Sequence, residues 1–139
     1  MFRMLDEDSP ISKEDLLQFE EILGKKLPKT MLDFYLKHNG GQPQVMGVHD
    51  GHHLFPFNSF NSLDEMRKSM KWFDDEVVPE GFKATDLLHF AYDPGSGNYA
   101  LSLKPEDYGK VYFYVLEEKA EIYGQWPSFE DFLNSFVEE

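Results

Sequence analysis

The chain has 139 residues, of which 41% are apolar and 16% aromatic, so it can bury the core of one ordinary domain. It contains no cysteine, which excludes a disulfide framework, a cysteine-ligated zinc site and a thiol nucleophile. Its 13 basic and 26 acidic residues give a net charge of −13, which disfavours nucleic acid as a partner and suits either a basic protein or solubility alone.

The first third of the chain predicts two helices. Ser12 opens a Ser-x-x-acid pattern that caps helix starts, and apolar residues at helical spacing follow it as far as Leu23. Gly24 then suits the end of a helix, because glycine readily adopts left-handed backbone angles. Pro28 suits the first position of a second helix, whose apolar residues follow the spacing i, i+3, i+4, i+7 up to His38.

The stretch HNGGQP predicts an abrupt end to that second helix. Asn39 and Gly40 tolerate positive φ and can therefore terminate it, while Gly41 and Pro43 can turn the chain toward a first strand. This local account needs no ligand, so we interpret the paired glycine as structural.

The middle of the chain predicts a short hairpin and a third helix. Segments 45–48 and 53–57 flank Asp50 and Gly51, a pair that suits a type I′ turn. After a Ser-x-x-Glu capping box, apolar spacing predicts a helix over about 63–73.

The second half of the chain predicts strands at 87–92, 98–103 and 110–116, separated by the turn-forming segments DPGSGN and KPEDYG. These strands predict an antiparallel meander, and a last helix is predicted over about 129–137. The expected fold class is α+β: a single domain over 1–139, with an antiparallel sheet of about four to six strands flanked by N-terminal, middle and C-terminal helices.

The segment VHDGHHLF raises the possibility of a metal site, because His49, Asp50, His52 and His53 can all ligate a divalent ion. On a tight turn, however, neighbouring side chains diverge, and the spacing matches no helical metal motif. We expect a solvated hairpin tip and no metal. An enzyme that uses a metal bound by His49, His52 and His53 stays the less favoured alternative.

The loop DPGSGN does not predict a phosphate site, because it joins two strands and lacks the lysine of a P-loop. Turn chemistry accounts for its proline and glycines. Ser96 lies in this loop without the G-x-S-x-G pattern of a nucleophile elbow. We therefore expect no catalytic residue and no cofactor.

The acidic runs 74–76 and 117–118 have two interpretations: solvated turns, or a docking face for lysine and arginine side chains of a partner. Aromatic anchors dominate the binding energy of many interfaces, so an exposed tryptophan near such acids is a candidate contact. Trp72 and Trp126 could equally be core residues, and the core is the favoured place for Trp126. The predicted partner-binding residues are Asp50, Trp72, Asp74, Asp75 and Glu76.

Four segments follow one another along nearly the whole chain: ISKEDLLQFEEILGKKLPKTMLDFYLKHNGGQP, HFAYDPGSGNYALSL, GKVYFYV and WPSFEDFL. Together they resemble the Smi/Knr-type group of the SUKH superfamily. One departure is an insertion-like PGS before Gly97, which indicates a longer or differently shaped turn. The positions that match the family pattern are Phe19-Glu20, Leu27-Pro28, Phe34, Asn39-Gly40-Gly41, Phe90-Ala91, Asp93, Gly97-Asn98, Leu101-Ser102, Gly109, Val111-Tyr112-Phe113 and Ser128 to Leu133.

The resemblance implies a non-enzymatic protein-binding domain with no catalytic residues. Bacterial members of the group look like immunity proteins of polymorphic toxin systems, which neutralise a cognate toxin, often a nuclease, in the cytoplasm of the producing cell. A regulatory scaffold with a housekeeping partner is the alternative. The acidic N-terminus, without the apolar stretch of a secretory signal, agrees with a cytoplasmic location, and no run of residues is apolar enough to span a membrane. The resemblance also implies structural roles for Pro28, Asn39, Gly40, Gly41, Gly97 and Asn98.

Overall fold

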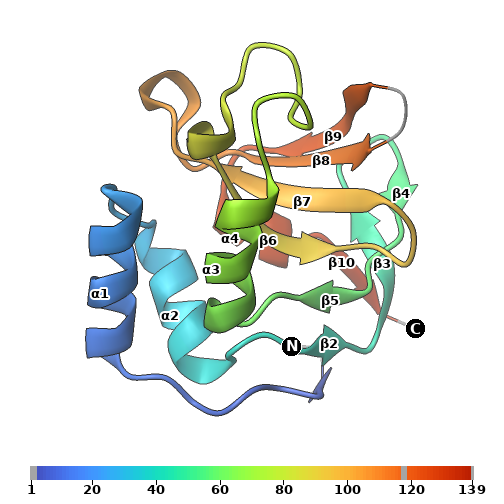
Figure 1. The fold of residues 1–139 in the computed structure, drawn as a ribbon. Helices are drawn as coiled ribbons and strands as arrows, with labels where there is room; N and C mark the ends of the chain where they lie inside the picture. The colour runs from blue at the N-terminus through green and yellow to red at the C-terminus, as the bar shows by residue number, and fades with distance from the viewer. Residues whose placement is uncertain (1–2, 117–118, 139) are drawn as a thin grey trace.

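The computed structural model describes residues 3–116 and 119–138, which form an α+β fold (Figure 1). The acidic run 117–118 lies outside these described residues. The α-helices of these ranges are α1 (Lys13–Leu23), α2 (Lys29–Lys37), α3 (Leu63–Trp72) and α4 (Phe129–Leu133). Short 3₁₀ turns are η1 (Ala84–Asp86) and η2 (Pro105–Asp107). The strands are β1 (Met4–Leu5), β2 (Gln42–Pro43), β3 (Val45–His49), β4 (Leu54–Phe55), β5 (Ser59–Phe60), β6 (Leu87–Tyr92), β7 (Gly97–Ser102), β8 (Val111–Leu116), β9 (Ala120–Trp126) and β10 (Phe136–Glu138).

The main sheet has five antiparallel strands in the order β5-β6-β7-β8-β9. Its three central strands confirm the predicted meander. Strand β9 was not predicted, although its sequence, AEIYGQW, alternates exposed and less exposed side chains as expected for a strand at a sheet edge. A second sheet, in the order β10-β3-β4, packs beside the first, and β1 pairs with β2.

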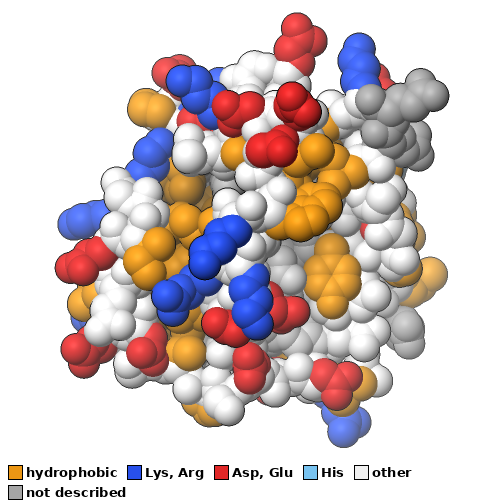
Figure 2. All heavy atoms as spheres, viewed as in Figure 1, with side chains coloured by type: hydrophobic (Ala, Val, Ile, Leu, Met, Phe, Trp, Pro, Cys, Tyr) orange, Lys and Arg blue, Asp and Glu red, His pale blue; other side chains and the backbone are white. Residues whose placement is uncertain are grey.

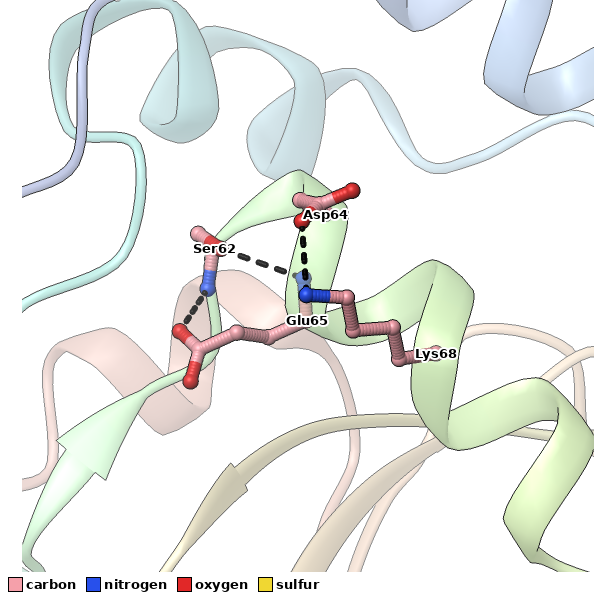
Figure 3. Close-up of polar contacts among 4 residues, drawn as sticks. All are labelled: Ser62, Asp64, Glu65 and Lys68. Atoms are coloured by element: carbon pink, nitrogen blue, oxygen red, sulfur yellow. Dashed lines mark hydrogen bonds and ion pairs between the residues drawn. The ribbon is translucent and has the colours of Figure 1, made fainter.

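Side-chain caps account for the starts of α1 and α3. The hydroxyl of Ser12 accepts a hydrogen bond from the Asp15 backbone N–H at 3.1 Å, and the Asp15 carboxylate accepts one from the Ser12 N–H at 2.8 Å. Ser62 and Glu65 make the same reciprocal pair at the start of α3, drawn in Figure 3 with the exposed ion pair between Asp64 and Lys68. Both helices therefore begin at the capping boxes that the sequence predicts.

Two predicted backbone details at the helix ends are wrong. Pro28 is the N-cap of α2 and not its first helical residue. Asn39 does not have positive φ, whereas Gly40 and Gly41 do, at 81° and 112°. The left-handed turn after α2 is therefore made by the two glycines, and Asn39 has a different role, described below.

The predicted last helix is too long, and the predicted hairpin turn has the wrong type. Helix α4 ends at Leu133 because the chain then forms β10, in which Phe136 pairs with Val48 of β3. The β3–β4 hairpin exists, but Asp50 does not have the positive φ that a type I′ turn requires. Instead, the Asp50 carboxylate accepts hydrogen bonds from the backbone N–H groups of His52 and His53.

The two faces of the five-stranded sheet are both covered. The inner face packs against the helices and the small strands in an aromatic core centred on Phe132, a side chain with no exposed surface. The outer face carries Leu87, Ala100, Tyr112 and Tyr114. Residues 73–86, hereafter the cover segment, pack on this outer face and connect α3 to β6.

Candidate partner-binding surface

The end of α3 exposes a tryptophan. Trp72 is 63% exposed, whereas Trp126 is 2% exposed and lies in the core, as predicted. Within α3 the buried residues are Leu63 and Met66, so the face that carries Trp72 points to solvent. The Trp72 ring packs edge-on against Phe73, with ring centroids 4.7 Å apart. An exposed indole supported on one side by another ring is typical of a binding anchor.

Phe73 fixes this anchor to the sheet. Its ring stacks on the imidazole of His89 with centroids 3.5 Å apart and planes 2° from parallel. On its other side, His89 Nε2 lies 2.5 Å from the Tyr114 hydroxyl oxygen. Burial lowers the pKa of His89 to about 3, so the imidazole is neutral near pH 7. A continuous series of ring contacts, edge-on at both ends and stacked in the middle, therefore runs from the exposed indole to Tyr114 of the sheet.

The acidic residues at positions 74–76 are exposed, but they differ in the hydrogen bonds that their carboxylates accept. The Asp74 carboxylate accepts a hydrogen bond from the Glu76 backbone N–H at 2.9 Å. The Asp75 carboxylate accepts one from the Ala84 N–H at 2.7 Å and so ties the two ends of the cover segment together. The Glu76 side chain is also exposed. Asp74 and Asp75 thus shape the segment, and all three carboxylates add negative charge beside the indole.

A groove of about 210 Å³ runs beside this cluster, between α1, the end of α3 and β6. Its rim includes Ile22, 52% exposed, and Met70, 38% exposed, and His89 and Phe73 contribute to its lining. Figure 2 shows this face, with basic side chains between hydrophobic patches and acidic side chains both at the top and in the lower part of the view. The exposed bases of α3 are Arg67, Lys68 and Lys71.

Asp50 lies on a different part of the surface, in the β3–β4 loop. It lines a shallow depression of about 320 Å³ with His52, His53 and residues 122–125 of β9. Slight burial acts to raise its pKa, but the N–H groups of His53 and His52 outweigh this and hold the pKa below its usual range. Trp72 and the acids 74–76 are contiguous in the chain, and neither the indole nor those acids line the Asp50 depression.

The histidine segment does not gather its side chains around one point. In the described ranges, no three His, Asp, Glu or Cys side chains converge as candidate metal ligands. The His49 Nδ1 atom accepts a hydrogen bond from the Gly51 backbone N–H, and the Asp50 carboxylate is turned toward its own loop.

The residues of the Asn-Gly-Gly motif lie inside the fold. Asn39 is buried; its amide donates to the Ser9 carbonyl at 2.8 Å, and its side-chain oxygen accepts from the Leu63 N–H at 2.9 Å. Asn39 therefore ties the N-terminal segment to the start of α3, a role that sequence reasoning missed because both partners are distant in the chain. A Cβ on Gly40 would lie 2.7 Å from the Ser62 backbone nitrogen, so the closeness of this turn to α3 requires glycine.

The loop after β6 is also closely packed. The Asp93 carboxylate accepts hydrogen bonds from the N–H groups of Gly95 and Gly97, at 2.8 and 2.7 Å. A Cβ on Gly97 would lie 2.5 Å from the Phe113 ring. Asn98 donates from its side chain to the Ser96 carbonyl at 3.3 Å. Hydrogen bonds of the turn and close packing against Phe113 therefore account for the conformation of this loop.

Comparison with known proteins gives one result for the family. The model of the SMI1 / KNR4 family (SUKH-1) matches residues 10–135, which is most of the 139-residue chain. No curated protein matches the chain. Within the described residues, none of the helices has the length and apolar character that crossing a lipid bilayer requires. The extent of the family match shows that the chain belongs to the SMI1 / KNR4 family (SUKH-1).

Proposed function

We propose that this protein is a non-enzymatic immunity protein that binds and neutralises a cognate toxin domain in the cytoplasm of the cell that makes the toxin. Membership of the SUKH family supports a protein-binding role. The net charge of −13 supports a basic partner, such as a toxin domain that cuts nucleic acid, because opposite charges accelerate encounter.

The observation that carries the proposal is the surface formed by Trp72, Asp74, Asp75 and Glu76. The indole is 63% exposed and makes an edge-on contact with Phe73, whose own ring is stacked on His89, so this contact reduces the conformational entropy that the indole would lose on binding. The adjacent carboxylates suit lysine or arginine side chains on the partner. Asp50, on its separate loop, is a second proposed contact for a partner large enough to reach both sites.

A regulatory scaffold with a housekeeping partner would use the same surface. Two observations distinguish it from an immunity protein: the absence of a toxin gene beside this one, and weaker binding. A metal enzyme based on His49, His52 and His53 would instead retain stoichiometric metal after purification and would lose activity when those histidines are replaced by alanine.

The test is co-expression with the toxin domain encoded beside this gene, followed by binding measurements on the purified pair. We expect the wild-type protein to restore growth and to form a one-to-one complex. Trp72→Ala should weaken binding by roughly 30-fold, the effect of losing an aromatic anchor. Met46→Ala is the matched control, because Met46 is 59% exposed but lies on β3, in the other sheet.

The contribution of charge to binding is tested separately with Glu76→Lys. Glu76 is chosen because the Asp74 and Asp75 carboxylates also accept hydrogen bonds from the backbone of the cover segment, so replacing either could change its structure. We expect a slower association rate and a weaker dependence of that rate on salt. Glu138→Lys on β10 makes the same change in charge at a distant strand and should have a much smaller effect. Failure of the wild-type protein to protect against any neighbouring toxin would overturn the proposal, and an association rate independent of salt would remove its electrostatic part.

A further inference from the structure

Helices α1 and α2 form a second exposed apolar surface, separate from the groove beside Trp72. They lie side by side at the end of the molecule away from the five-stranded sheet (Figure 1). Between them runs a groove of about 230 Å³ whose apolar lining includes Leu17, Leu32 and Leu36. Leu17 is 51% exposed and Leu36 is 41% exposed. Hereafter this groove and its rim are the α1–α2 face.

The core uses only part of this apolar lining: Leu32 packs against the main core, whereas Leu17 and Leu36 are not among its residues. Helix α1 buries Leu16 and Phe19, and α2 buries Met31, Phe34 and Tyr35, so each helix already has a buried stripe. Leu36 forms a second apolar stripe on α2 with Leu32, and Leu17 is a single leucine on the exposed side of α1. Leucines at such positions lower solubility unless another surface covers them.

The charges of this face differ from those of the rest of the protein. Helix α1 carries one lysine against four acids, a net charge of −3. Residues 24–37, hereafter the α2 segment, carry four lysines against one acid, a net charge of +3. The rim of the groove has both signs, with Lys13 and Lys29 facing Glu20 and Asp33. In a molecule of net charge −13, this surface is therefore locally balanced.

We propose that the α1–α2 face binds a second copy of this chain in a two-fold symmetric dimer. A two-fold axis places the same patch of both protomers together, so α1 of each can lie against the α2 segment of the other. In that arrangement α1, with a net charge of −3, lies against an α2 segment with a net charge of +3 at each of two contacts. The same contacts cover the exposed leucines. A purely basic partner would find no such complementarity with the α2 segment, which is itself basic.

The first test measures the mass of the purified protein by sedimentation equilibrium over a range of concentrations. We expect wild type to approach twice the 16.3 kDa of one chain. Leu17→Glu and Leu36→Glu should each raise the dimer dissociation constant more than about tenfold, since a carboxylate would be buried among leucines. Leu54→Glu is the matched control: Leu54 is 44% exposed on β4, and its replacement should leave the dimer unchanged.

The second test uses charge alone and does not depend on the leucine variants folding. In Lys29→Glu/Lys37→Glu the α2 segment changes from +3 to −1, and in Glu14→Lys/Glu21→Lys helix α1 changes from −3 to +1. Each double variant alone then opposes like charges and should be monomeric. Mixed together, the two variants pair opposite charges at both contacts and should form a heterodimer.

Three results would overturn the proposal: a wild-type protein that stays monomeric at its highest soluble concentration, leucine variants that fold and still dimerise, or charge variants that fail to associate on mixing. This inference is independent of the proposed function, because none of the substituted residues lines the groove beside Trp72. Leu36→Glu should therefore be monomeric and still bind the toxin domain, whereas Trp72→Ala should remain dimeric and bind it poorly.

Discussion

On the inner face of the five-stranded sheet, aromatic rings from helices and strands interlock, whereas on the outer face a single segment of chain, residues 73–86, supplies much of the covering. The Phe132 ring has seven other aromatic rings around it, each with a centroid-to-centroid distance of 6.5 Å or less. The cover segment contributes the buried Val78 and the partly buried Phe73, Phe82 and Ala84.

The outer covering is held by discrete polar contacts in addition to packing. The Lys104 ammonium donates to the Gly81 carbonyl at 2.9 Å and lies 4.6 Å above the Phe82 ring centroid. The Asp75 carboxylate accepts from the Ala84 N–H. Because these contacts and its packing hold the cover segment on the outer face, exposed acids and an exposed indole can lie there without disturbing the aromatic core on the inner face. The comparison suggests that the inner face supplies most of the stability and that the outer covering presents the binding surface.

The largest effect is expected from Phe132→Ala, which removes the ring at the centre of the inner face. Phe132 has no exposed surface, so the substitution leaves a cavity and should lower the free energy of unfolding by about 3–5 kcal/mol. Urea denaturation followed by tryptophan fluorescence measures this change. A loss below about 1 kcal/mol would mean that the inner face does not dominate stability.

The second effect concerns pH and arises on the outer face. The pKa of His89 is lowered to about 3 by burial, against 6.5 when exposed, so above about pH 6.5 the group contributes no pH dependence. As the pH falls below 6.5, the unfolded chain binds a proton that the folded chain does not, and stability decreases by about 1.4 kcal/mol for each pH unit. Between pH 7 and pH 5, wild type should therefore lose roughly 2 kcal/mol more than His89→Gln.

His89→Gln is the suitable variant because glutamine does not titrate and can still reach the Tyr114 hydroxyl with a polar group. Burial also raises the pKa of Tyr114, so that neighbour is uncharged over the whole range. Free energies of unfolding from urea curves at several pH values give the two slopes. Parallel curves for wild type and variant would show that His89 binds its proton in the folded protein as readily as in the unfolded chain.

Sequence reasoning succeeded where one local pattern determines one structure. The Ser-x-x-acid starts at Ser12 and Ser62 fixed the first residues of α1 and α3, and β-branched and aromatic runs identified β6 to β8. The end of α4 was missed because Phe136 has helical spacing from Phe132, yet its backbone pairs with β3. Whether this segment forms a helix or a strand therefore depends on the presence of β3 as a pairing partner.

The candidate surface was predictable only in part. The acids 74–76 are a visible run in the sequence, but helical spacing alone does not tell whether Trp72 faces the core or solvent. That orientation depends on which face of α3 is buried in the folded protein, and the contact of Phe73 with His89, 16 positions later in the sequence, is likewise formed only on folding. The role of Asn39 likewise depends on Ser9 and Leu63, which only the folded chain brings together.

A third, smaller effect is expected from Val78→Ala in the cover segment. Val78 is buried on the outer face, and loss of two methyl groups should cost roughly 1–2 kcal/mol. Hydrogen exchange should increase mainly in residues 73–86, whereas exchange in β7 and β8 should change little, because the segment can open without disrupting the inner face. Uniform acceleration across the sheet would instead mean that the two coverings unfold together.

The smallest effect on stability is expected from Trp72→Ala. The indole is 63% exposed and its one ring partner among the described contacts is Phe73, so the free energy of unfolding should change by less than about 1 kcal/mol. Urea denaturation of Trp72→Ala and Val78→Ala under the same conditions gives the comparison directly. If Trp72→Ala costs more than Val78→Ala, the indole is part of the covering, and any loss of partner binding in that variant would reflect a displaced cover segment. If it costs less while toxin binding falls, the outer face separates its structural residues from its binding residues within a span of seven positions, Trp72 to Val78.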